Sequence, residues 1–335
     1  MIITRTPFRI SFAGGGSDLE AFYAEESGAV ISTAIDKYMY LMVKERFGDT
    51  FRVSYSRTEL TDRADQIEHP IVRECLALSG MQRGLEIVSV ADLPAQSGMG
   101  SSSSFTVGLL HALAALQGRV VSPRALAEQA CHIEIERLHE PIGKQDQYIA
   151  AFGGLQFIQF HPDGHVSVDP VVCRPAVRRE LNRRLLLFFT GLTRDAREVL
   201  GRQRSGTADR RPALRRLCRI AHDMRDVLTS DDAGDAVPSA HLEGFGRLLH
   251  EAWEVKKSVE GTISNPAIDS WYERGLAAGA LGGKLLGAGS GGFLLFFCEP
   301  DNQPRLREAL AELRPVSFTL EPEGSKVIFV GPEHW

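Results

Sequence analysis

Cysteine and long hydrophobic runs are both scarce in this chain. Its five cysteines are scattered along 335 residues and never form a Cys-x-x-Cys pair, which argues against a disulfide framework or a structural zinc site and favours a reducing compartment. The longest apolar run near the C-terminal end, residues 293–298, is too short to cross a bilayer, and residues 1–7 lack the apolar core of a signal peptide. We therefore expect a cytoplasmic protein without a membrane partner.

The chain also lacks a basic composition and two common nucleotide-binding motifs. Its net charge is −5, so nucleic acid is not an expected partner. An arginine-rich segment at residues 202–219 precedes an acidic loop, and we interpret both as solvated surface. No Gly-x-x-x-x-Gly-Lys-[Ser/Thr] loop is present, and the glycine run at residues 287–292 precedes a strand, which is not the context of a dinucleotide-binding motif. This pattern disfavours an NAD-linked dehydrogenase.

The length of the chain allows two lobes with ample core. A composition shift near residues 161–175 marks the expected boundary, which divides the chain into residues 1–165 and 166–335. Strands are expected at residues 8–13, 38–45, 85–90, 155–160, 185–190 and 292–298, with 50–56 paired to 38–45 and a hairpin formed by 316–320 and 326–330. Helices are expected at residues 17–23, 105–116, from 122, at 265–278, at 302–313, and across 194–260 with a polar loop at 230–239.

Three glycine-rich segments, at residues 13–18, 96–104 and 282–292, stand far apart in the sequence. Glycine lets the backbone approach a ligand without a Cβ in the way, and we expect each segment at a strand–helix junction. The middle one runs into a helical pattern that begins at Phe105, and a helix start offers unpaired N–H groups to an anion. Taken alone it could equally be a flexible Gly/Ser linker. All three together favour a nucleotide triphosphate.

Two carboxylates stand out between the second and third glycine segments. Glu134 falls on the apolar face of the helical pattern at residues 126–138, whereas Glu136 points away from it. A carboxylate in that position needs a cation, so we expect either a magnesium ligand or an ion pair with Arg137 or another buried base. Asp146 follows a short loop and has Lys144 two positions before it. It is either a catalytic carboxylate, held ionised by that lysine, or a helix N-cap.

Together these segments resemble the GHMP kinase family. Pro94 with residues 98–102 is similar to its phosphate-loop motif, residues 7–18 to its first motif and residues 283–292 to its third, in the family's order and across nearly the whole chain. Met99 replaces the usual leucine, a change that conserves volume. Residues 9–18, 143–148 with 152–154, and 190–194 resemble bacterial D-glycero-D-manno-heptose 7-phosphate kinases more narrowly, with L-fucokinases as close relatives.

The resemblance implies an ATP- and Mg²⁺-dependent enzyme. Asp146 would be the base that orients or deprotonates the acceptor hydroxyl, and Arg9 would stabilise charge beside it. The third motif, including Gly289, would support the phosphate loop and close the substrate pocket. Lys144 is a further candidate from its position alone: it could steady a phosphate instead of holding Asp146 ionised. The ATP-binding residues implied are Pro94, Gly98, Gly100, Ser101, Ser102 and Ser103; the Mg²⁺ ligands are the Ser102 hydroxyl and Glu134; the residues for sugar hydroxyls are Gly15, Gly16 and Asp18.

The implied reaction transfers the γ-phosphoryl group of ATP to the anomeric C1 hydroxyl of D-glycero-D-manno-heptose 7-phosphate, for nucleotide-activated heptose in surface polysaccharide. A substrate that already carries a phosphate needs a second anion site, for which Arg194, Lys37 and Arg5 are candidates. The planar fork of arginine suits phosphate better than lysine does, and Arg194 leads. The implied fold is a two-lobed α+β architecture, with mixed and antiparallel sheets flanked by helices and the active site in the cleft between lobes. The alternatives are an L-fucokinase or other GHMP sugar 1-kinase, and an inactive sugar-binding sensor.

Overall fold

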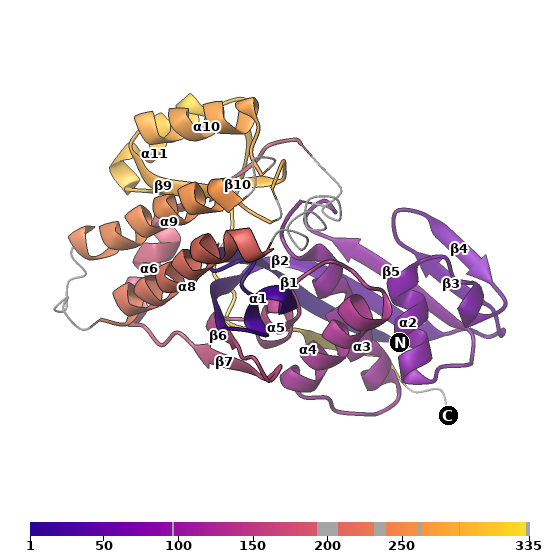
Figure 1. The fold of residues 1–335 in the computed structure, drawn as a ribbon. Helices are drawn as coiled ribbons and strands as arrows, with labels where there is room; N and C mark the ends of the chain where they lie inside the picture. The colour runs from indigo at the N-terminus through magenta and orange to yellow at the C-terminus, as the bar shows by residue number, and fades with distance from the viewer. Residues whose placement is uncertain (96, 193–206, 231–238, 260–262, 288, 333–335) are drawn as a thin grey trace.

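The computed structural model describes the whole chain except residues 96, 193–206, 231–238, 260–262, 288 and 333–335. The described residues form two β-sheets with helices packed against them, and the sheets belong to two lobes (Figure 1). The α+β architecture predicted from the sequence is therefore confirmed.

The larger sheet is built around one long strand, β2 (Gly28–Glu45). Strand β1 (Ile2–Ala13) runs antiparallel along nearly the whole of one edge of β2. The other edge is shared, because β6 (Leu155–Phe160) pairs with the first residues of β2 and β5 (Leu85–Ala91) with the last. The remaining strands of this sheet are β3 (Phe51–Ser54), β4 (Thr58–Thr61), β7 (Val166–Pro170) and β12 (Lys326–Val330).

Two predicted strand pairings are wrong. Strand β3 does not pair with β2, because β5 occupies that edge of β2 and β3 adds in parallel to the far edge of β5. The C-terminal segments form no hairpin either: β12 pairs with β1, whereas β11 (Arg314–Val316) pairs with β8 (Leu185–Phe189) of the smaller sheet. The intervening Pro/Gly segment thus carries the chain from one sheet to the other, and turn residues alone do not distinguish a crossing from a hairpin.

The smaller sheet has the order β11-β8-β10-β9, where β9 is Ala280–Leu285 and β10 is Phe293–Cys298. Every residue of β10 is buried. Alternate side chains enter two different clusters: Leu295 and Phe297 join the main core, and Phe296 joins a smaller core beneath α10 (Pro266–Ala277) and α11 (Gln303–Ala309). A strand covered on both faces explains the unbroken apolar run in its sequence.

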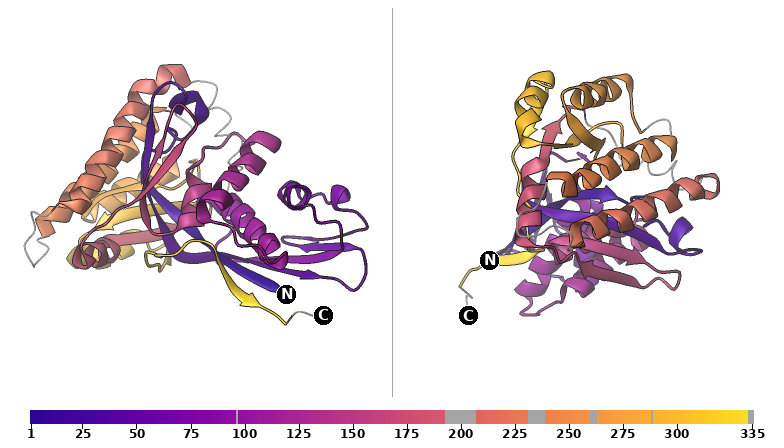
Figure 2. Two further views of the ribbon diagram at one scale, coloured as in Figure 1. Left: turned by 90° about the horizontal axis from the view of Figure 1, so that it is seen from below. Right: turned by 90° about the vertical axis from the view of Figure 1, so that its left-hand side faces the viewer.

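Two long helices connect the sheets. Helix α8 (Thr207–Thr229) packs on β1, β2 and α9 (Ser239–Val259), and α9 packs on β9. In the right-hand view of Figure 2, α8 and α9 lie between α10 and the indigo strands at the start of the chain. The other helical elements are α1 (Glu20–Tyr23), α2 (Pro70–Ser79), α3 (Ser101–Leu116), α4 (Pro123–Cys131), a π-helical turn (His132–Arg137), α5 (Gln145–Phe152), α6 (Pro175–Arg184) and two 3-10 turns (Ala64–Gln66, Pro300–Asn302).

The expected division after residue 165 remains a prediction. Strand β7 follows that boundary yet pairs with β6 of the larger sheet, and α8 packs on the same sheet from beyond it. A domain boundary at residue 165 would therefore divide the hydrogen-bonded hairpin that β6 and β7 form. Among the described helices, none combines the length and the apolar character needed to cross a membrane.

Candidate active site

A cleft opens between the two lobes. One wall is formed by the second half of β1 and the glycine turn after it, which supply Arg9 and Asp18, and the start of α5 adds Asp146. The opposite wall is formed by α8 and α9, with Leu214 and Lys256, and by the turn between β9 and β10. The first and third glycine segments and residues 142–146 are thus brought together from distant parts of the sequence.

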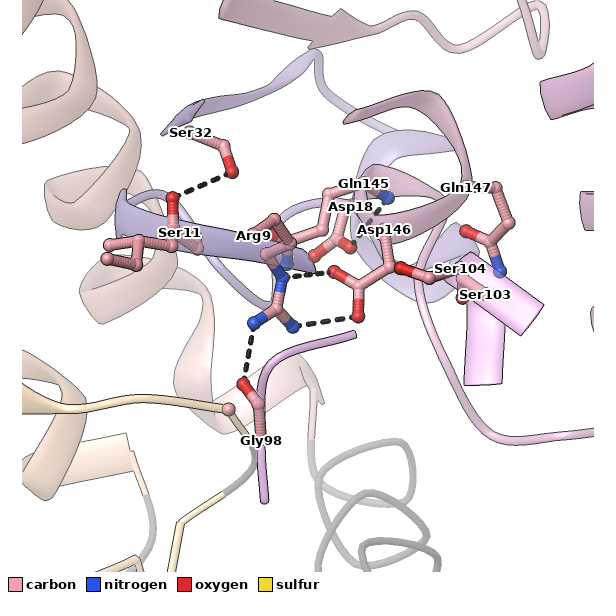
Figure 3. Close-up of polar contacts among 12 residues, drawn as sticks. Arg9, Ser11, Asp18, Ser32, Gly98, Ser103, Ser104, Gln145, Asp146 and Gln147 are labelled. Carbon is pink, nitrogen blue, oxygen red and sulfur yellow. Dashed lines mark hydrogen bonds and ion pairs between the residues drawn. The ribbon is translucent and has the colours of Figure 1, made fainter. Parts of the chain in front are cut away.

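The Arg9 guanidinium and the Asp146 carboxylate form a two-pronged ion pair in the cleft (Figure 3). Arg9 Nε donates to Asp146 Oδ1 and Arg9 Nη2 to Asp146 Oδ2, each at 2.7 Å, and Arg9 Nη1 donates to the Gly98 carbonyl at 2.6 Å. The planar fork of arginine matches a carboxylate in this geometry. Arg9 therefore ties Asp146 to the loop before α3. Asp146 lies inside the first turn of α5 and Lys144 takes the N-cap position, so the N-cap alternative for Asp146 is wrong.

Asp18 is a second carboxylate in the same cleft. It is buried and accepts hydrogen bonds from the backbone N–H groups of Gly16 at 2.9 Å and Gln145 at 3.2 Å. Burial raises the pKa of Asp18, and the nearby charge of Asp146 raises it further. A Cβ on Gly143 would lie 2.0 Å from Asp18 Oδ2. Glycine is therefore required at position 143 for this carboxylate to fit.

Helix α3 begins at Ser101, four residues before the predicted start at Phe105. Its N-cap is Gly100, with a φ of +76°, and no side chain caps the first turn. The serine hydroxyls bond elsewhere: Ser104 Oγ donates to the Pro7 carbonyl at 2.8 Å, and Ser102 and Ser103 both turn to Glu134. The first backbone N–H groups of a helix without a side-chain cap suit an anion.

Glu134 is fully buried, as its place on the apolar face predicts. Its carboxylate accepts hydrogen bonds from Ser102 Oγ at 2.5 Å, Ser103 Oγ at 2.9 Å and Gln147 Nε2 at 2.7 Å. Burial raises its pKa, and these three bonds oppose the shift without cancelling it. The residue sits in the π-helical turn after α4, a local geometry that is frequent at functional sites.

The neighbouring charged residues separate from Glu134. Glu136 is largely exposed and bonds to His132. Arg137 pairs with Glu74 on α2. The ion pair between Glu134 and Arg137 that we considered from the sequence is therefore not formed.

The second and third glycine segments meet backbone to backbone. A Cβ on Gly98 would lie 2.6 Å from the Leu286 carbonyl oxygen, and one on Gly287 would lie 2.3 Å from the Gly98 Cα. Gly292 approaches the Ser97 carbonyl equally closely. The third segment therefore supports the loop before α3. It connects β9 to β10, so the expected strand–helix junction at this segment is wrong.

Some of the other predicted site residues line the cleft and others do not. Gly15 and Gly16 line the cleft, and Pro94 is exposed at the start of the loop before α3. The Lys144 ammonium lies over the Tyr23 ring, 4.8 Å from its centroid, and its other described contact is the Gly164 carbonyl, so nothing described joins it to Asp146. Gly289 packs on the backbone of Ile263 and is not among the described residues that line the cleft.

Two of the three residues predicted for a second anion site, Arg5 and Lys37, are not among the described residues that line the cleft. Arg5 lies over the Tyr38 ring and pairs with Glu323. Lys37 pairs with its neighbour Asp36. Arg194 lies outside the described residues.

Two lysines of the cleft were missed from the sequence. Lys284 of β9 is buried, and its ammonium donates to the Ser11 and Phe12 carbonyls of β1 at 2.8 Å each. Lys256 of α9 donates to the Gly287 carbonyl. Burial and the Arg9 charge lower the pKa of Lys256 to about 8. The glycines beside Lys284 predicted a turn where the structure has a strand. For Lys256, nothing in the sequence of α9 indicates that it enters the cleft and Lys257 does not.

Ser11 and Gln145 were missed as well. The hydroxyl of Ser11 and Oε1 of Gln145 are buried and have no hydrogen-bond partner among the described residues, and both residues line the cleft. A buried polar atom without a partner is costly. Both atoms are therefore suited to hydrogen bonds with a polar ligand.

Two family models match the chain. The model described as the GHMP kinases N terminal domain matches residues 64–154, and the one described as GHMP kinases C terminal matches residues 235–315, together just over half of the chain. The chain belongs to the GHMP kinase family. It is therefore an ATP-dependent kinase. The loop before α3, Glu134 and Asp146 fall within the first match, and the third glycine segment falls within the second.

Named relatives of this GHMP kinase include enzymes that act on sugars. It is 28% identical to the D-glycero-alpha-D-manno-heptose 7-phosphate kinase of Campylobacter jejuni, over 96% of this chain and 97% of that one. It is 26% identical to the bifunctional fucokinase/GDP-fucose pyrophosphorylase of Arabidopsis thaliana, over 91% of this chain but 31% of that protein. A D-glycero-D-manno-heptose 1-phosphate kinase from Bacteroides thetaiotaomicron shares the fold, with a TM-score of 0.80, 23% identity and coverage of 99% and 100% of the two chains.

Proposed function

We propose that this GHMP kinase phosphorylates the anomeric C1 hydroxyl of D-glycero-D-manno-heptose 7-phosphate, in the cytoplasm. The observation that carries the chemistry is the Arg9–Asp146 pair, which faces the cleft and is bonded to the loop before α3. The substrate is supported by the similarity to the Campylobacter jejuni enzyme along nearly the full length of both chains.

Asp146 acts on the acceptor hydroxyl. Each carboxylate oxygen has two lone pairs, so the bonds to Arg9 leave one on each oxygen for a proton. The hydroxyl oxygen forms a bond to the γ-phosphorus, the bond from that phosphorus to the oxygen of the leaving ADP breaks, and the hydroxyl proton goes to Asp146. Arg9 keeps its charge next to the reacting oxygens. Asp18, Ser11 and Gln145 orient the sugar through its hydroxyls.

The start of α3 and the loop before it hold the phosphates of ATP. Gly98 and Gly100 both have positive φ values, which shape the turn into α3, and the uncapped N–H groups at the start of α3 suit an anion. The donor set for Mg²⁺ is one buried carboxylate, Glu134, with the Ser102 hydroxyl at 2.5 Å from it. Carboxylate and hydroxyl oxygens suit this ion, which also takes phosphate oxygens. Bound there, Mg²⁺ would neutralise charge on the phosphates.

A substrate panel tests the proposal. ADP release is measured with heptose 7-phosphate, L-fucose, galactose and mannose, and ³¹P–¹H correlation spectra locate the new phosphate on the sugar. We expect the highest kcat/KM with heptose 7-phosphate and coupling of the new phosphorus to the anomeric proton. Higher kcat/KM with L-fucose would favour the fucokinase alternative, and coupling to another proton would refute transfer to C1. No ADP release with any sugar in excess would favour the sensor.

A further inference from the structure

Lys256 lines the same cleft as Arg9 and Asp146. It lies in the C-terminal part of α9 and is partly exposed to the cleft. Its described hydrogen bond is to the Gly287 carbonyl, which accounts for one of the three N–H groups of an ammonium. No ion pair among the described residues includes Lys256, so its positive charge has no carboxylate partner there.

The two nearest cleft cations are already engaged. All three nitrogens of the Arg9 guanidinium are bonded to Asp146 or to the Gly98 carbonyl. The Lys284 ammonium bonds two backbone carbonyls of β1. These bonds use three of the five N–H groups of Arg9, and Asp146 compensates its charge; Lys256 keeps two N–H groups and, among the described residues, has no carboxylate partner.

The cleft also gathers positive charge. Burial lowers the pKa values of Lys256 and Lys284. The charge of Arg9 lowers both further, as the charge of Lys256 does for Lys284, so these positive groups repel one another. Among the described residues, the Asp146 carboxylate pairs with Arg9, and the Asp18 carboxylate accepts from the backbone N–H groups of Gly16 and Gln145 instead of from a cleft cation. An anion placed between these groups would relieve the repulsion. A neutral sugar would not.

We propose that Lys256 binds a phosphoryl group inside the cleft that Arg9 and Asp146 also line. Two groups have this chemistry: the phosphate that the sugar already carries, and the phosphoryl group in transfer from ATP. Lysine acts on either as a point charge with rotatable donors. A contact with the phosphate of the sugar rests on the proposed function, whereas a contact with the phosphoryl group of ATP requires only that the protein is a kinase.

Lys256→Met tests the inference, with Lys257→Met as the matched control. Lys257 is the next residue of the same helix, pairs with Glu254 and lies over the Trp253 ring, outside the cleft. For both variants, kcat and the KM of each substrate are measured with heptose 7-phosphate and with the unphosphorylated heptose, and thermal unfolding confirms the fold.

The result identifies the source of the phosphoryl group. Loss of the sugar phosphate contact would raise the KM of heptose 7-phosphate by about tenfold or more and leave the KM of the unphosphorylated sugar unchanged. Loss of a contact with the transferred group would instead lower kcat by about the same factor for both sugars. An unchanged kcat and unchanged KM values in Lys256→Met would overturn the inference, as would an equal loss in Lys257→Met.

Lys256→Arg keeps the inference testable if the methionine variant does not fold. The pKa of about 8 predicts that in the wild type the affected parameter worsens as pH rises through that value, because the ammonium loses its proton. Arginine stays charged, so Lys256→Arg should remove this alkaline loss. The other charged groups that line the cleft are Arg9, Lys284, Arg210, Asp18 and Asp146. Identical alkaline profiles for the wild type and Lys256→Arg would contradict the inference.

The wild-type substrate panel separates this test from that of the proposed function. If the wild type is active with an unphosphorylated sugar and inactive with heptose 7-phosphate, the proposed substrate fails. The comparison of Lys256→Met with Lys257→Met is then made on the accepted sugar. There a normal kcat in Lys256→Met refutes the inference, and a reduced kcat supports contact with the transferred group.

Discussion

Asp146→Asn is the substitution that most directly tests the proposed chemistry. Asparagine keeps the size of the side chain and an oxygen that can accept from Arg9 Nε, where the present bond is 2.7 Å long. It removes the negative charge and the capacity to take a proton. General-base catalysis contributes about 10²- to 10⁴-fold to a rate, so we expect kcat to fall by about that factor. The KM for ATP should stay unchanged, because Gly98 and Ser102 are untouched.

The same substitution has a calculable effect on stability. The bond from Arg9 Nη2 to Asp146 Oδ2 is lost, and the two side chains are 8% and 22% exposed. A hydrogen bond to a charged group contributes about 1.5–3 kcal/mol, so the free energy of unfolding should fall by about that amount. Most of the protein should therefore remain folded during the assay, since domains have about 5–15 kcal/mol of stability.

The assay is ADP release under saturating ATP, with thermal unfolding measured in parallel. Asp49→Asn is the control, because Asp49 is exposed in the loop between β2 and β3 and is not among the described residues that line the cleft. Asp146→Ala should be as inactive as Asp146→Asn while still binding ATP. A kcat in Asp146→Asn that equals that of Asp49→Asn would refute the role of Asp146.

Three further substitutions test the rest of the site. Glu134→Gln removes the buried carboxylate that is bonded to Ser102, so the apparent Kd for Mg²⁺ in the presence of ATP should rise about tenfold or more. The control, Glu136→Gln, changes an exposed residue and should leave this Kd unchanged, and equal Kd values for the two variants would contradict the assignment of Glu134. Gly98→Ala places a Cβ 2.6 Å from the Leu286 carbonyl oxygen at a residue with a φ of +78°, so both the affinity for ATP and the Tm should fall. Wild-type values of both quantities would show that the loop tolerates a side chain there. Asp18→Asn should raise the KM for the sugar and leave the KM for ATP unchanged. Because burial raises the pKa of Asp18, acidification should raise the sugar KM of the wild type at a higher pH than it would for an exposed aspartate, and initial rates measured across pH would detect this.

Local patterns predicted the parts of the site that depend on local structure. The helical periodicity alone placed Glu134 inside and Glu136 outside, because one turn of helix decides which side chain faces the core. Its hydrogen-bond partners were beyond reach, since Gln147 and Ser103 come from two other helices. The same limit applies to Arg9 and Asp146, which are 137 positions apart. Their contact was expected from the family resemblance alone.

Errors and omissions arose where tertiary contacts decide. The first half of β2 was not predicted, although its residues are buried, because its edges pair with β1 and with β6, a strand more than a hundred residues away. Lys256 and Lys257 are adjacent on one helix, and the packing of α9 on β9 decides which of them enters the cleft. Lys284 is hidden among glycines that serve the close approach of β9 to α9, where a Cβ on Gly282 would lie 2.1 Å from the Gly246 carbonyl.

The two walls of the cleft are tied together at the place where phosphate would pass from donor to acceptor. Gly98 and Gly287 are in backbone contact there, and the Lys284 ammonium bridges β9 to two carbonyls of β1. Separating the walls here would leave the Lys284 ammonium and two β1 carbonyls without their hydrogen-bond partners, at a cost in free energy for each group. The contacts that bring Arg9 and Asp146 next to the start of α3 are therefore part of the resting fold, and the geometry for transfer does not have to be assembled by the substrate.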